Sequence, residues 1–152
     1  MAYIAQMVNV LQAMILTDGP KMALTPTYHA FQMYVPFQGA TFLPADVQTP
    51  DYSLGPETVP AVSVTATRDT TGKLQLALVN LDPKREAVVT TDVTGAQVKG
   101  ATGRVLTAKA MDAHNTVDAP EAVKPTAFGA RRSGGKLVLR LPPKSVAVVA
   151  LE

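Results

Sequence analysis

Two histidines and twelve carboxylates are the side chains of this 152-residue sequence that are best suited to acid–base or metal chemistry. A metal site built from Asp112, His114 and Asp118 is conceivable, because these residues share one short polar run. That run contains no paired-histidine motif and no acid-rich calcium loop, however. Asp, Asn and Thr side chains in such a run ordinarily hydrogen-bond the backbone of a turn. The sequence therefore predicts no metal site and no cofactor.

Nucleophilic residues are equally scarce. The absence of Cys excludes a thiol nucleophile, a thiolate metal site and a disulfide scaffold. None of the four serines lies in a Gly-x-Ser-x-Gly elbow. Ser133 precedes Gly134 and Gly135, but this run leads into a strand, whereas a phosphate-binding loop opens a helix. No carboxylate stands at a strand end where burial would raise its pKa. We predict no catalytic residue in this chain.

Charge and aromatic content exclude other classes of function. The net charge is +2, and 47% of the residues are hydrophobic, so the chain should fold. Residues 1–67 carry a net charge of −3 and residues 68–152 carry +5, yet Phe128 is the only aromatic residue of the basic part. Nucleic-acid platforms need several stacking rings, so we expect no nucleic-acid partner. No apolar run reaches the roughly 20 residues of a membrane-spanning helix.

Two helices are predicted near the N-terminus. Apolar residues recur at intervals of three or four over residues 4–16, which is typical of an amphipathic helix with a broad apolar face. Asp18-Gly19-Pro20 should end this helix. A second helix is predicted from Thr25-Pro26, a capping residue followed by proline, to Pro36. His29 falls within it and should be a packed or hydrogen-bonded helix residue.

The remainder of the chain changes from irregular to strand-like. Five prolines interrupt residues 36–60, which we interpret as a strap containing short extended pieces such as 40–43. From residue 61 the pattern alternates with the period of two that strands require. Strands are predicted near residues 62–67, 74–78, 87–93, 102–111, 137–141 and 146–151. The last two are apolar on nearly both faces and should lie centrally in a sheet. Six or more strands separated by turns predict an antiparallel β-sandwich.

Several runs of the sequence resemble one known family. The run Ile4–Thr17 and the run Leu24–Tyr34 are similar to the late barrel segment of α-L-arabinofuranosidases of glycoside hydrolase family 51. Further matches follow in the same order along the chain, at residues 78–83, 103–108, 111–118 and 141–146. The resemblance thus covers almost the whole chain, although none of these runs is a catalytic motif.

The resemblance implies the C-terminal region of a larger enzyme. The expected fold is mainly β: an antiparallel jelly-roll-like sandwich preceded by two helices that resemble the end of a (β/α)8 barrel. Residues 1–36 would be the terminal barrel helices, residues 37–60 the strap and residues 61–152 the sandwich. The family's two catalytic glutamates lie upstream of the matched runs, so the chain alone is expected to be inactive. Gln6 matches a family glutamine that approaches the arabinose, and it is the one substrate-binding residue that we predict.

Three functions follow as hypotheses. The first is a non-catalytic C-terminal domain of a retaining α-L-arabinofuranosidase that acts on arabinoxylan or arabinan, with the catalytic barrel as its partner. The second is a stand-alone carbohydrate-binding sandwich, which the absence of Trp makes less favourable. The third is a structural or assembly module in which the apolar face of the first helix is buried against the sandwich or against another copy of the chain.

Overall fold

The computed structural model describes residue 4 and residues 6–152, and it is built mainly of β-strands. In chain order the elements are β1 (Ile15–Asp18), β2 (Lys21–Leu24), α1 (Pro26–Met33), the 3-10 helix η1 (Val35–Phe37), β3 (Thr41–Leu43), β4 (Asp51–Leu54), β5 (Glu57–Pro60), β6 (Val62–Arg68), β7 (Leu74–Asn80), β8 (Ala87–Thr91), β9 (Ala101–Leu106), β10 (Thr126–Gly129), β11 (Arg131–Ser133), β12 (Lys136–Leu141) and β13 (Ser145–Leu151).

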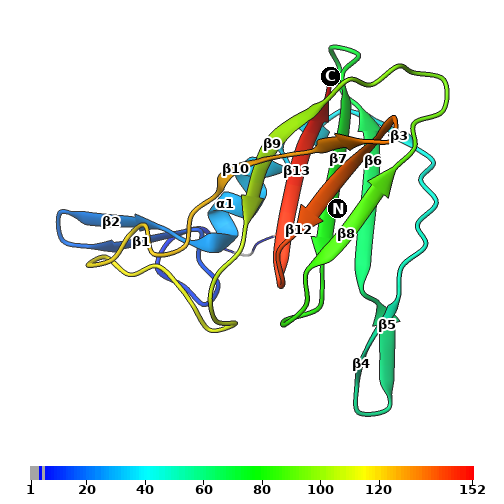
Figure 1. Ribbon diagram of the computed structural model, residues 1–152. Coiled ribbons are helices and arrows are strands. Elements are labelled where there is room, and N and C mark those ends of the chain that lie inside the picture. The colour runs from blue at the N-terminus through cyan, green and yellow to red at the C-terminus, as the bar shows by residue number, and fades with distance from the viewer. Residues whose placement is uncertain (1–3, 5) are drawn as a thin grey trace.

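Two antiparallel sheets form a sandwich (Figure 1). The larger sheet has six strands in the order β10-β9-β13-β7-β6-β3, and the smaller has three in the order β11-β12-β8. The apolar core between the sheets includes Leu78, Leu139, Leu141 and Val149, none of which is more than 1% exposed. The predicted mainly β, antiparallel sandwich is therefore confirmed.

The last two strands occupy the centres of the two sheets. β13 lies between β9 and β7, and β12 lies between β11 and β8. Each of these strands has neighbours on both edges, and together they supply much of the core. This confirms the central positions that were predicted for the last two strands, although the outer face of β12 carries the exposed Lys136 and Arg140.

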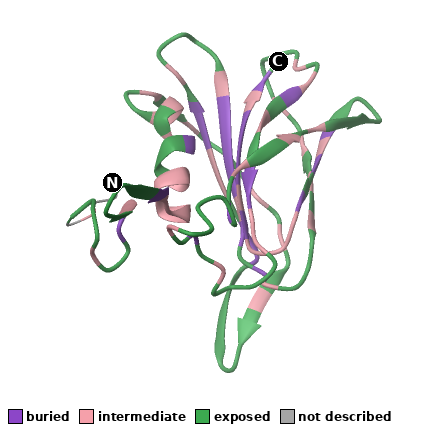
Figure 2. Cartoon of the chain, turned by 90° about the vertical axis from the view of Figure 1, so that its left-hand side faces the viewer, coloured by how far each residue is buried: buried purple, intermediate pink, exposed green. Residues whose placement is uncertain are grey.

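Helix α1 covers part of the outer face of the six-stranded sheet (Figure 2). Its N-cap is Thr25, whose hydroxyl accepts a hydrogen bond from the amide of Tyr28 at 3.3 Å, and Pro26 occupies the first turn. Met33 at its end packs with Ala77 and Val148 of the sheet. The second predicted helix is thus confirmed, starting at the expected cap and ending three residues before Pro36.

The first predicted helix, over residues 4–16, is wrong for the described residues. Residues 6–14 form bends and turns, and strand β1 begins at Ile15. Asn9 and Gln12 have φ angles of 52° and 61°, which no right-handed helix accommodates. The amides of Met14 and Ile15 both donate to the carbonyl of Met7, so the chain folds back on itself. The apolar residues spaced at intervals of three or four therefore lie in bends and turns and not on one face of a helix.

The Asp18-Gly19-Pro20 run has a different role from the one expected of it. Asp18 pairs with Lys21, so Gly19 and Pro20 form the two-residue turn of the β1–β2 hairpin. Gly19 has a φ of 53°, a value that glycine adopts without strain. The run ends a strand here, because the same residue types that stop helices also form tight turns.

Within residues 36–60, the structure forms more strands than the prolines suggested. β3 pairs with β6 at the edge of the large sheet, where an extended piece was expected. Strands β4 and β5 form a hairpin that projects from one end of the sandwich (Figure 1).

The strand predicted over 102–111 ends at Leu106, and residues 107–124 form an irregular loop. None of the helices in the described part of the chain is long and apolar enough to cross a membrane.

Candidate functional site

The loop of residues 107–124 holds a group of polar contacts centred on one buried asparagine. At its centre Asn115 is 1% exposed. Its Nδ2 donates to the carbonyl of Leu24 at 2.7 Å and to that of Val123 at 2.9 Å. Its Oδ1 accepts from the amide of Val123 at 2.7 Å. One side chain therefore joins the β1–β2 hairpin to the loop that follows β9.

Apolar and ionic contacts extend the same connection. Val123, fixed by Asn115, packs in one buried cluster with Met33 of α1 and Leu106 of β9. Lys21 of the hairpin forms an ion pair with Asp118, although both side chains are largely exposed. Such an exposed pair contributes little stability, so Asn115 and the apolar cluster carry the connection. We call this set of contacts the junction, because it joins residues 13–37 to the sandwich.

Thr25 ties the start of α1 into the junction. Its hydroxyl donates to the carbonyl of Ala13 at 2.7 Å while it caps the helix. Ala13 and Ala23 are 3% and 1% exposed, so the turn before β1 and the hairpin are both held close to the rest of the chain. The sequence indicated the cap but not its second bond, which depends on a turn that the apolar pattern concealed.

The loop does not gather the three residues considered for a metal site. Asp118 faces Lys21, and the Nδ1 atom of His114 lies 2.8 Å from the backbone oxygen of Asp112. Among the described residues, no three His, Cys, Asp or Glu side chains lie close enough together to hold a metal ion. The loop's polar residues serve as turn and junction contacts instead.

His29 lies within α1, as expected. Burial lowers the pKa of its imidazole, and its ring packs edge-on against Tyr28 with centroids 5.6 Å apart. The structure gives its buried Nδ1 no hydrogen-bond partner among the described residues. A partly buried imidazole with a lowered pKa favours the neutral form, so His29 is better placed to pack than to carry charge.

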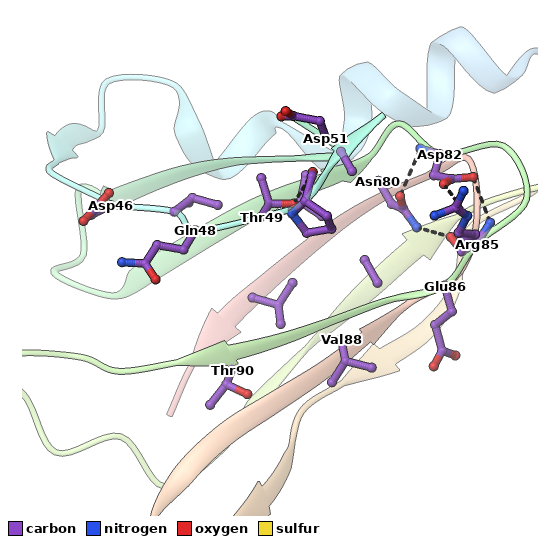
Figure 3. Close-up of a pocket in the computed structure, with 16 residues that line it drawn as sticks. Asp46, Gln48, Thr49, Asp51, Asn80, Asp82, Arg85, Glu86, Val88 and Thr90 are labelled. Atoms are coloured by element: carbon purple, nitrogen blue, oxygen red, sulfur yellow. Dashed lines mark hydrogen bonds and ion pairs between the residues drawn. The ribbon is translucent and has the colours of Figure 1, made fainter. Parts of the chain in front are cut away.

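A recess between the strap and the edge strand β8 collects several acidic residues (Figure 3). Its volume is about 340 Å³, and its lining includes Asp46, Asp51, Asp82 and Glu86. Asp82 accepts hydrogen bonds from the backbone amides of Lys84 at 2.8 Å and Arg85 at 2.9 Å, which lower its pKa. Glu86 is paired with Arg140 at 2.8 Å.

Such carboxylates are poor candidates for glycosidase chemistry. A glycosidase needs one carboxyl group with a raised pKa to protonate the leaving oxygen. The pKa of Asp82 is lowered instead, as are those of Asp69, bonded by the side chains of Thr71 and Gln75, and of Glu121, bonded by Lys124. Asp82, the recess carboxylate with a lowered pKa, is therefore poorly suited to act as the general acid.

Gln6, the predicted substrate-binding residue, is exposed near the start of the described chain. It is the first residue of the folded-back segment, where Asn9 Nδ2 donates to the hydroxyl of Thr17 in β1 at 2.8 Å. The structure brings none of the other residues singled out in the sequence, His29, Asp112, His114 or Asp118, into a shared site with it. Its role remains a prediction.

Comparison with known proteins identifies the family. The model of the α-L-arabinofuranosidase C-terminal domain matches residues 1–145 of this chain. The chain belongs to this family. The resemblance read from the sequence is thereby confirmed.

Individual relatives support the same assignment. The intracellular exo-α-L-arabinofuranosidase of Bacteroides ovatus is 39% identical over 154 residues, which cover all of this chain and 30% of that protein. The GH51 arabinofuranosidase of Xanthomonas axonopodis pv. citri is 48% identical with a TM-score of 0.92, over 97% of this chain and 30% of that one. The thermostable GH51 α-L-arabinofuranosidase of Thermotoga petrophila RKU-1 is 26% identical with a TM-score of 0.80, over 97% and 33%. This domain therefore spans about a third of the length of these relatives.

Proposed function

We propose that this chain is the non-catalytic C-terminal domain of a retaining α-L-arabinofuranosidase that acts on arabinose-containing hemicellulose such as arabinoxylan or arabinan. Its role would be to brace the catalytic barrel. The observation that carries this proposal is the junction, in which the buried side chain of Asn115 fixes the β1–β2 hairpin to the sandwich. Residues that the family resemblance places at the end of the barrel are thus held by the sandwich itself.

The β1–β2 hairpin also offers a face for the barrel. By the register of the hairpin, Leu16 and Ala23 share one face with Lys21, and this face is directed towards the loop that contains Asp118. The opposite face carries Ile15, Met22 and Leu24, of which Met22 is 59% exposed. Met22 thus leaves apolar surface open on this face, and further protein should cover it. The rest of the barrel is the partner that we propose there.

The alternative of a stand-alone carbohydrate-binding sandwich has less support. Sugar-binding platforms use exposed aromatic rings. Phe128 is the only aromatic residue in residues 61–152, and it packs against the sandwich core. The bracing role is therefore the better supported of the two.

A chimera tests the proposal. This chain would replace the matching C-terminal part of the Xanthomonas enzyme, and hydrolysis of 4-nitrophenyl α-L-arabinofuranoside would be measured for the chimera and for this chain alone. We expect turnover by the chimera and none above the blank by the isolated chain. Turnover by a contaminant-free sample of the isolated chain would contradict the non-catalytic assignment.

The junction can be tested in the same chimera. Asn115→Leu leaves the carbonyls of Leu24 and Val123 and the amide of Val123 without their partner, at a cost of about 1–3 kcal/mol for each buried group. We expect the chimera to lose activity on heating at a clearly lower temperature, with its activity at 25 °C retained. Gln97→Leu, at an exposed position, is the matched control and should leave the inactivation temperature unchanged. Equal inactivation temperatures for both variants would argue against bracing through Asn115.

We further propose that Gln6 contacts the arabinose in the complete barrel. Loss of one hydrogen bond to substrate costs about tenfold in affinity. Gln6→Ala in the chimera should therefore raise KM by about this factor without lowering the thermal midpoint. An unchanged KM and kcat would remove Gln6 from the site.

A further inference from the structure

The turn that follows Gln6 uses backbone conformations that residues other than glycine rarely adopt. Asn9 has a φ of 52° and Gln12 a φ of 61°, both in the left-handed region. Such conformations cost free energy, and they persist only where the surrounding structure holds them. They gather at functional sites, where a strained backbone keeps a side chain in one position. Two left-handed residues close behind Gln6 therefore indicate that other contacts fix this turn.

The residues after Gln6 are bonded to strand β1 of the β1–β2 hairpin. Val8 and Ile15 form a parallel bridge. The amide of Ile15 donates to the carbonyl of Met7 at 2.9 Å, and the amide of Asn9 donates to the carbonyl of Ile15 at 3.1 Å. The chain therefore runs parallel to β1 along the edge of the hairpin, and Gln6 directly precedes the first of these bonded residues.

The side chain of Asn9 strengthens this pairing. Its Oδ1 accepts from the amide of Thr17 at 2.7 Å. Its Nδ2 donates to the hydroxyl of Thr17 at 2.8 Å and to the carbonyl of Thr17 at 3.2 Å. We call these three bonds the Asn9 clamp. Asparagine is one of the few residue types that enter the left-handed region routinely, so one residue supplies both the turn and the clamp.

We propose that Asn9 is a positioning residue, which holds Gln6 in the orientation that the arabinose requires. This inference rests on the proposed contact between Gln6 and the sugar. A mobile backbone next to Gln6 would have to be ordered each time substrate binds, and this ordering would reduce the affinity. The Asn9 clamp and the bonds to Ile15 order the backbone beforehand. The β1–β2 hairpin then supports a binding residue as well as offering a face to the barrel.

A double-mutant cycle in the chimera tests the proposal. Asn9→Gly removes the clamp and keeps the left-handed backbone, which glycine adopts without strain. It should raise KM for 4-nitrophenyl α-L-arabinofuranoside about fivefold with kcat nearly unchanged, because Gln6 must now be ordered on binding. In a chimera that already carries Gln6→Ala, the same change should have almost no further effect on KM. A clamp that only stabilised the fold would act equally with and without Gln6→Ala.

Variants of two neighbouring residues separate the side chain from the backbone. Gln12→Gly is the matched control, because Gln12 is exposed, has the same kind of φ and lies outside the clamp. Both glycine substitutions add similar freedom to the unfolded chain, yet Gln12→Gly should leave KM unchanged. Thr17→Val removes one acceptor of the clamp and should raise KM about twofold, whereas Thr17→Ser keeps the hydroxyl and should keep the natural KM.

Hydrogen exchange in the isolated chain measures the clamp without any substrate. The amide of Ile15, which bonds Met7 beside Gln6, should exchange about tenfold faster in Asn9→Gly and at the natural rate in Gln12→Gly. Equal rates in the natural sequence and Asn9→Gly would overturn the proposal, whatever the chimera does.

The kinetics can overturn the proposal in three ways. The first is a natural KM in Asn9→Gly, and the second is a rise that is equally large with and without Gln6→Ala. The third is a natural KM in Gln6→Ala itself, which would remove Gln6 from the site and Asn9 with it. A raised KM in Gln6→Ala beside a natural KM in Asn9→Gly would reject the positioning role alone. Inactivation temperatures show whether each variant is folded, and Thr17→Val replaces Asn9→Gly in the cycle if the glycine variant does not fold.

Discussion

At the residue scale, two buried asparagines each hold separate segments of the chain together through several hydrogen bonds. Asn80 is 1% exposed, and its Nδ2 donates to the carbonyls of Arg85 at 2.9 Å and Pro142 at 2.9 Å. It thus holds together two turns that lie at the same end of the sandwich. Asn115 does the same between the hairpin and the loop after β9. Both side-chain amides can be buried because each is hydrogen-bonded to backbone groups that lack a strand partner. A buried amide without hydrogen bonds would cost folding free energy.

Gly103 is required by close contact between backbones. A Cβ atom at this position would lie 2.0 Å from the carbonyl oxygen of Val148 and 2.7 Å from Cα of Val149, both in the adjacent strand β13. Backbone atoms cannot move aside as a flexible side chain does, so Gly103→Ala should cost at least about 3 kcal/mol or prevent folding. Urea denaturation measures the change. Gly100→Ala is the control, since its Cβ would meet only a side-chain oxygen of Glu152 at 3.7 Å. Similar midpoints for the two variants would contradict the close approach.

Asp69 should make the stability of the β6–β7 hairpin depend on pH. The hydroxyl of Thr71 at 2.7 Å and the amide of Gln75 at 2.9 Å bond its carboxylate and hold its pKa well below the ordinary value. A lowered folded-state pKa stabilises the protein above the ordinary carboxyl pKa, and this stability is lost as the pH falls below about 4. Asp69→Asn should therefore be less stable than the natural sequence at about pH 6, with the difference shrinking towards about pH 2.

Thermal melts at several pH values check this expectation. Thr71→Val removes only the hydroxyl donor and should change the melting temperature in the same direction by a smaller amount. A constant difference between Asp69→Asn and the natural sequence across the acid range would show that Asp69 does not supply this pH dependence.

At the scale of elements, the local sequence predicted an element correctly where it encodes a specific hydrogen bond. Thr25-Pro26 predicted the start of α1, because a hydroxyl cap and a proline in the first turn satisfy the helix end directly. Over residues 6–14 the apolar spacing misled, because Asn9 and Gln12 adopt left-handed backbone conformations that the spacing does not encode. The β4–β5 hairpin was not predicted either, because Pro56 and Pro60 suggested an irregular strap.

The cap of α1 gives a prediction at this scale. Thr25→Ala removes the bond from Tyr28 and the bond to Ala13, so the chain should lose about 1–2 kcal/mol of stability. Thr25→Ser keeps the hydroxyl and should retain most of it. Urea denaturation followed by circular dichroism compares the three proteins. If serine and alanine are equally destabilising, the hydroxyl is not the source of the effect.

At the scale of the whole molecule, stability should be graded from the sandwich to the projecting hairpins. β13 and β7 lie inside the six-stranded sheet, and the core packs against their inner face. The β4–β5 hairpin has strand pairing only within itself. Protection from exchange follows burial and the number of bonds that must open together. We expect the slowest amide exchange in β13 and β7 and fast exchange in the β4–β5 hairpin.

Hydrogen exchange followed by NMR measures this gradient residue by residue. Amides of the β4–β5 hairpin as protected as those of β13 would contradict the gradient.

The sequence by itself determined the sandwich, the helix at Thr25 and the family. Strands with a period of two, turn residues between them and a capping threonine act over a few residues, so they are readable without knowing what lies nearby. Only the tertiary structure decided the backward fold of residues 6–14, the burial of Asn115 and the β4–β5 hairpin. Each of these depends on groups that are distant in the sequence or on backbone angles that several residue types share. The bond from Asn115 to Leu24 joins residues 91 positions apart, and no local pattern can specify it.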